Sequence, residues 1–163
     1  MGSKSGRPTG PAAAALAGRL VQLVGDHDAA RFSREVSRVC VEPHLTEGRP
    51  AYGDVIAWVV DAIVDVLTAR LGAAGPGERF ILDLRFTDGA PVVVDDLPES
   101  ERWVLRTVAA FLAEEVVEGE RLLAAAEHRF DLTMRAETLA DALVWLDFIL
   151  DVDLPDPPDV ITA

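Results

Sequence analysis

The sequence predicts a mainly α fold in which five to six helices pack as a bundle-like array around one core. Apolar side chains recur every three or four residues over most of the chain, which is the spacing of helices that bury one face. Gly and Pro separate these periodic segments. Only one stretch, about residues 79–95, alternates with the period of a strand, so one central β-hairpin is expected there.

The chain of 163 residues has the length of a single domain. We expect that domain over residues 11–153. Residues 1–10 are rich in Gly, Ser and basic side chains, and residues 154–163 are rich in Pro and Asp. Such compositions are typical of flexible tails.

Three helices are expected in the first half, over about residues 11–24, 28–41 and 51–71. Gly25 ends the first and Pro43 stops the second. Each segment carries its apolar residues at helical spacing.

The hairpin prediction depends on a short alternating segment and a turn signal. Apolar and charged residues alternate from Phe80 to Phe86, and Asp88-Gly89 is a dipeptide typical of hairpin turns. Pro91 favours an edge strand or a strand start. Two strands alone are marginal, so they should lie on helices or pair with another copy.

Three more helices are expected in the second half. The fourth opens in the segment DLPESERW and runs to about residue 117, and Gly119 indicates a bend or break. The fifth covers about 119–130 and the sixth about 134–152.

The two helical halves show a weak sequence similarity. An Asp precedes a Trp by four residues at Asp54–Trp58 and again at Asp141–Trp145. This favours two related three-helix halves, although apolar helices also match by chance.

Three aspartates of the third helix, Asp54, Asp61 and Asp65, fall within an arc of about 40° at 100° per residue. We call these three residues the acidic seam. It has three interpretations: the solvent-exposed side of the helix, an ion-pair surface, or a metal or catalytic site. In the ion-pair interpretation, the partners of the aspartates would be a row of arginines on the second helix, formed by Arg31, Arg34 and Arg38.

Large apolar residues fall off the core face of the sixth helix, beside Asp141. They are Trp145, Phe148 and Val152. Together with Phe80, Leu82 and Phe86 of the hairpin, they are candidates for a protein interface, because apolar groups outside the core stripe mark contact patches. Cover by the hairpin or the C-terminal tail is the alternative.

Charge narrows the choice of partners. The net charge of −13 argues against nucleic-acid binding, which depends on phosphate neutralisation. Residues 1–41 have a balance of +3 and residues 42–163 a balance of −16. This asymmetry favours contacts between copies or with a basic protein, whereas the simpler interpretation is that acidic groups keep an apolar protein dissolved.

The sequence contains no recognisable catalytic or metal-binding motif. Cys40 and His44 provide two potential zinc ligands where four are needed, and Cys40 falls on an apolar face. A single cysteine fits a reducing cytoplasm, and no apolar run is long enough for a membrane span. The sequence therefore predicts no enzyme, cofactor or metal.

From these observations we expect a non-catalytic cytoplasmic interaction or adaptor protein that forms a homodimer. One alternative is an acidic inhibitor of the antitoxin or immunity type, which covers a basic partner. Another is a helical-bundle pocket for an apolar small ligand.

Overall fold

The computed structural model describes residues 10–41, 48–72, 75–77 and 83–152, and these residues form six α-helices and a short 3-10 helix. The α-helices are α1 (Pro11–Gly25), α2 (Ala29–Cys40), α3 (Tyr52–Leu71), α4 (Glu99–Leu112), α5 (Val116–His128) and α6 (Leu132–Asp151). The 3-10 helix η2 (Val94–Asp96) precedes α4. The predicted mainly α, bundle-like class is confirmed.

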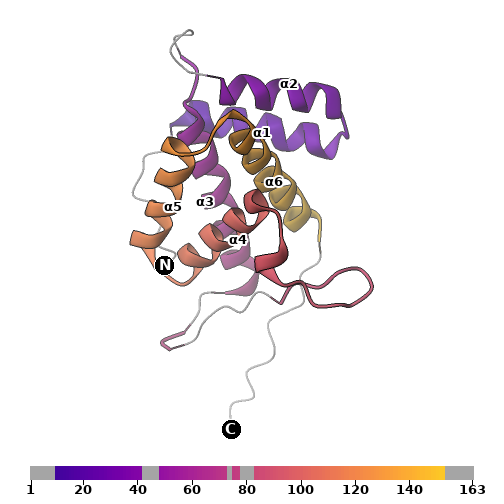
Figure 1. Ribbon diagram of the computed structural model, residues 1–163, viewed down its shortest axis with the longest axis vertical. Helices are drawn as coiled ribbons and strands as arrows, with labels where there is room; N and C mark the ends of the chain where they lie inside the picture. Colours follow the sequence, from indigo (N-terminus) through magenta and orange to yellow (C-terminus); the bar gives the residue numbers. More distant parts are fainter. Residues whose placement is uncertain (1–9, 42–47, 73–74, 78–82, 153–163) are drawn as a thin grey trace.

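Helices α3 and α6, each of 20 residues, form the centre of the fold. Helix α6 packs against α1, α2, α3 and α4, and α3 also packs against α1, α4 and α5. Helices α1 and α2 lie side by side across the top of the molecule (Figure 1). Because the two central helices have neighbours on several sides, they are apolar around most of their circumference.

Local signals explain where several helices begin. The Asp28 carboxylate accepts a hydrogen bond from the backbone N–H of Arg31 at 3.1 Å, and the Asp131 carboxylate accepts one from Met134 N–H at 2.8 Å. These two aspartates cap α2 and α6. Pro11 occupies the first turn of α1, where its missing N–H costs nothing.

The predicted break at Gly119 is wrong, because Gly119 lies inside α5. The chain turns instead at residues 113–115, where Glu114 adopts a φ of 60°. Gly119 is explained by packing: a β-carbon there would lie 2.6 Å from Cζ of Phe111 in α4. The glycine lets the two helices approach closely.

The predicted hairpin is not formed by the described residues 83–95. They contain one isolated antiparallel bridge, Arg85 to Pro91, and no strand. The Asp-Gly turn does form, with Gly89 at a φ of 85°. The Val92 N–H donates to the Leu84 carbonyl at 2.8 Å and the Phe86 N–H to the Ala90 carbonyl at 2.9 Å, and these two bonds flank the bridge. The chain then winds into η2 at Val94, so the described residues on this side leave the extended conformation directly after the bridge. Residues 79–82 lie outside the described residues.

The two halves have similar helix lengths. Helices α1, α2 and α3 have 15, 12 and 20 residues, and α4, α5 and α6 have 14, 13 and 20. The two Asp–Trp pairs do not occupy equivalent positions in α3 and α6, however. Trp58 lies in the second turn of α3 and Trp145 two turns further along α6. A relation between the halves stays a prediction.

Candidate functional site

The outward face of α6 carries large apolar side chains in water. Val144 is 51% exposed and Phe148 is 52% exposed, and their spacing of four residues places them on one side of the helix. The Trp145 ring meets Phe148 edge to face, with ring centroids 5.9 Å apart and planes at 89°. Trp145 also packs against the core, so it holds the exposed Phe148 ring in place. We call Val144, Trp145 and Phe148 the α6 patch.

Acidic side chains border the α6 patch. Asp141, Asp147 and Asp151 belong to the same helix. The Asp141 carboxylate accepts a 2.5 Å hydrogen bond from the buried Ser100 hydroxyl, which fixes it against the start of α4. Burial, and secondly the charge of Asp141, raises the pKa of the Glu101 carboxyl nearby. The patch therefore combines an apolar centre with a negatively charged surround.

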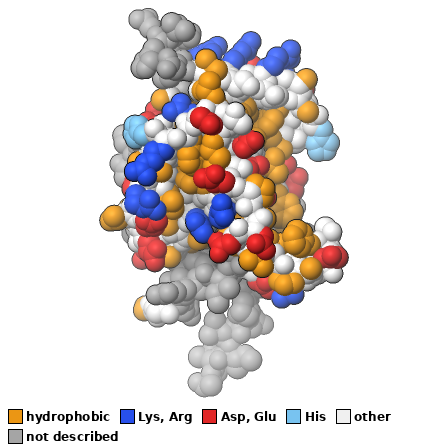
Figure 2. Space-filling view, in the orientation of Figure 1, with side chains coloured by type: hydrophobic (Ala, Val, Ile, Leu, Met, Phe, Trp, Pro, Cys, Tyr) orange, Lys and Arg blue, Asp and Glu red, His pale blue; other side chains and the backbone are white. Residues whose placement is uncertain are grey.

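The other predicted interface residues lie apart from this patch in the sequence. Phe86 is 57% exposed at the turn before η2. Phe80 and Leu82 lie outside the described residues. Hydrophobic side chains gather over α6 and again on the loop at the lower right in Figure 2.

Val152 follows the last turn of α6 and is partly buried. The Arg70 guanidinium, from the end of α3, donates to the carbonyl of Val152 at 2.5 Å and to that of Leu150 at 2.8 Å. Carbonyls at a helix end lack partners within the helix, so this fork ties the end of α6 to α3.

The acidic seam lies along α3 as one stripe. Asp54 and Asp61 are half-buried and Asp65 is exposed, with the half-buried Trp58 between them. Most other positions of the first three turns are buried. The stripe is thus the least buried side of this central helix.

The arginine row of α2, formed by Arg31, Arg34 and Arg38, is exposed. Figure 2 shows basic side chains along the upper edge of the molecule, over α2. Arg38 pairs with Glu35 of its own helix at 2.7 Å. Because α2 packs mainly against α1 and α6, the fold does not align this row with the α3 seam.

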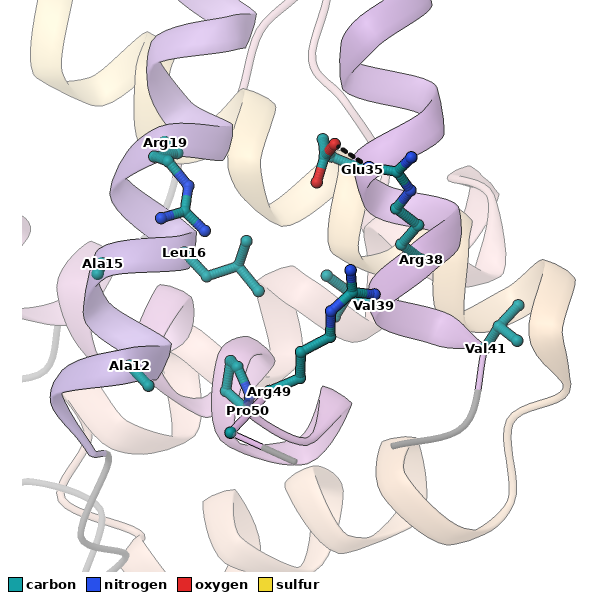
Figure 3. Close-up of a pocket in the computed structure, with 11 residues that line it drawn as sticks. Ala12, Ala15, Leu16, Arg19, Glu35, Arg38, Val39, Val41, Arg49 and Pro50 are labelled. Atoms are coloured by element: carbon teal, nitrogen blue, oxygen red, sulfur yellow. Dashed lines mark hydrogen bonds and ion pairs between the residues drawn. The ribbon is translucent and has the colours of Figure 1, made fainter. Parts of the chain in front are cut away.

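A cavity of about 280 Å³ opens between α1, α2 and the segment before α3 (Figure 3). Arginines from all three segments line it, namely Arg19, Arg38 and Arg49. Sequence reasoning missed this site. Arg19 and Arg38 contribute to the positive charge balance of the first 41 residues, but Arg49 lies outside that segment. No local pattern links the three arginines, which are 19 and 11 residues apart along the chain.

A buried polar cluster joins the end of α2 to the starts of α3 and α6. The Arg135 guanidinium carbon lies 5.3 Å from the centroid of the Tyr52 ring, and Arg135 donates to the Glu127 carbonyl at 2.6 Å. Burial raises the pKa of the Cys40 thiol to about 11, and it outweighs the charge of Arg135, which lowers this pKa. Burial, and then the neighbouring Cys40, raises the pKa of Tyr52. At neutral pH the thiol is therefore protonated and a poor nucleophile.

Within the described ranges, no group of three or more His, Cys, Asp and Glu side chains is placed to hold a metal ion. None of the described helices is both long enough and apolar enough to cross a membrane.

Comparison of the chain with known protein families, curated proteins and solved structures finds no match.

Proposed function

We propose that this protein is a non-catalytic interaction protein that forms a homodimer through the α6 patch. The observation that carries the proposal is the half-exposed Phe148, held by Trp145 and neighboured by Val144. Aromatic anchors fixed by packing lose little conformational entropy on binding, and they dominate the energy of many interfaces.

A twofold dimer suits a patch on one helix, because α6 of one copy can lie across α6 of the other so that each patch meets itself. A stable interface buries about 800 Å² on each partner, which exceeds one helix face. The loop before α4 exposes further apolar side chains, Phe86 and Val93, and the proposal assigns them to the same interface.

The net charge of −13 opposes dimer formation, since each copy repels the other. Salt screens that repulsion, with a Debye length of about 8 Å at physiological ionic strength. Self-association should therefore strengthen as salt is added.

A second candidate function is an acidic inhibitor that covers a basic partner. The acids Asp141, Asp147 and Asp151 next to the α6 patch favour it, because a positive surface would gain from contact with them. Here the salt dependence has the opposite sign, and binding should weaken as salt rises.

Sedimentation velocity at tens of micromolar protein tests the proposal. We expect a dimer, and we expect its dissociation constant to decrease when the salt concentration is raised from 20 mM to 300 mM. A monomer at every concentration and salt level would contradict the proposed homodimer. The inhibitor would then be tested by capture of a basic protein that 300 mM salt releases.

A further inference from the structure

The arginine-lined cavity carries an inference that does not depend on self-association. It is built by α1, α2 and the segment Gly48–Pro50, none of which belongs to the α6 patch. Its volume of about 280 Å³ lies just below the range of about 300–1,000 Å³ that is typical of ligand sites, so any ligand must be small.

The charges of the cavity are unbalanced. Three guanidinium groups face one carboxylate, that of Glu35, which is already paired with Arg38 at 2.7 Å. Within the part of the chain that the structure describes, Arg19 and Arg49 form no hydrogen bond or ion pair with a side chain. In Figure 3 the guanidinium groups of both point toward the space between α1 and α2. Among the described residues, two guanidinium groups without a carboxylate partner thus line one cavity.

The remaining wall is apolar. Ala12, Ala15 and Leu16 line it from α1, and Val39 lines it from α2. Leu16 extends into the space between Arg19 and Arg49 in Figure 3. A ligand that satisfies both the arginines and this wall has a charged head and a hydrocarbon body.

We propose that this cavity binds a small amphipathic anion, with a carboxylate or phosphate head held by Arg19 and Arg49 and a short aliphatic body against Leu16 and Val39. Guanidinium groups bind both heads through paired hydrogen bonds. The apolar wall gains from covering the aliphatic body.

The test is titration of the full chain with hexanoate, hexyl phosphate, inorganic phosphate and hexanol, followed by the side-chain Nε–Hε resonances of the arginines. We expect saturable shifts at Arg19 and Arg49 with hexanoate or hexyl phosphate, and the stronger of the two identifies the head group. Hexanol should cause no saturable shift, and inorganic phosphate should bind at least tenfold more weakly than hexyl phosphate.

Arg19→Gln and Arg49→Gln should each weaken binding about tenfold or more, because each removes a charge-assisted hydrogen bond. Arg34→Gln is the matched control: it removes the same charge from exposed α2 without touching the cavity, and it should bind as the wild type does. Circular dichroism checks that all variants are folded.

The proposal is overturned if neither hexanoate nor hexyl phosphate gives saturable shifts. It is also overturned if the Arg19 and Arg49 variants bind like Arg34→Gln, or if inorganic phosphate binds as tightly as hexyl phosphate. The last result would show that the apolar wall plays no part.

Discussion

The aromatic ring of Phe111 occupies the space that a side chain at Gly119 would need. A β-carbon at Gly119 would approach Cζ of Phe111 to 2.6 Å, and Phe111 is itself buried in the core. This contact sets how closely α4 and α5 pack.

Gly119→Ala should therefore destabilise the fold by about 1–3 kcal/mol, because the buried ring has little room to move. Gly18→Ala is the matched control in α1, where a new β-carbon meets nothing within 4 Å. That change should stabilise the fold by about 0.5–1 kcal/mol, since alanine is the better helix former. Urea denaturation measures both, and two changes of the same sign would refute the packing explanation.

Arg70 is expected to hold the end of α6. Arg70→Gln removes the fork that donates to the carbonyls of Leu150 and Val152, and should cost about 1.5–3 kcal/mol. Amide hydrogen exchange should accelerate in the last turn of α6 more than elsewhere.

Arg70→Lys separates charge from geometry. A lysine keeps the positive charge but cannot reproduce the planar fork, so it should rescue only part of the stability. Full rescue by lysine would show that the charge alone matters.

Alkaline pH should destabilise the protein through Cys40. Below pH 9 the thiol keeps its proton in both the folded and the unfolded chain. Between pH 9 and the folded pKa of about 11, only the unfolded chain loses the proton. The free energy of unfolding should thus fall by about 1.4 kcal/mol per pH unit in that window.

Cys40→Ala is the control for this prediction. Its stability should fall less steeply between pH 9 and 11, although the raised pKa of Tyr52 still contributes above pH 10. Equal slopes for the variant and the wild type, measured by urea denaturation, would rule out the role of the thiol.

The sequence predicts the helices well because their signals are local. Pro11 and Asp28 act within one turn, and α1 and α2 begin within one residue of the predicted starts at 11 and 28. Helix α6 begins at Leu132, two residues before the predicted start, because Asp131 caps it. Gly119 misleads because its reason is tertiary: it accommodates a ring from another helix. The Asp-Gly turn likewise forms, whereas a ladder needs partners that the turn signal does not provide.

The α6 patch and the arginine-lined cavity also differ in whether local sequence signals reveal them. The residues of the α6 patch lie on consecutive turns of one helix, so helical periodicity alone places Phe148 outside the core stripe. In the structure Phe148 is indeed exposed. The cavity arginines come from three segments and meet only through packing of α1 and α2. No local pattern could have joined them.

The most direct test of the proposed homodimer changes one side chain of the α6 patch. Phe148→Asp should weaken self-association at least tenfold, because it replaces the anchor with a charge that repels the other copy. Val117→Asp is the control, since Val117 is 87% exposed on α5 and lies outside the patch. By sedimentation equilibrium we expect a dimer for the wild type and Val117→Asp and a monomer for Phe148→Asp, whereas an unchanged dimer in Phe148→Asp would contradict the proposed interface.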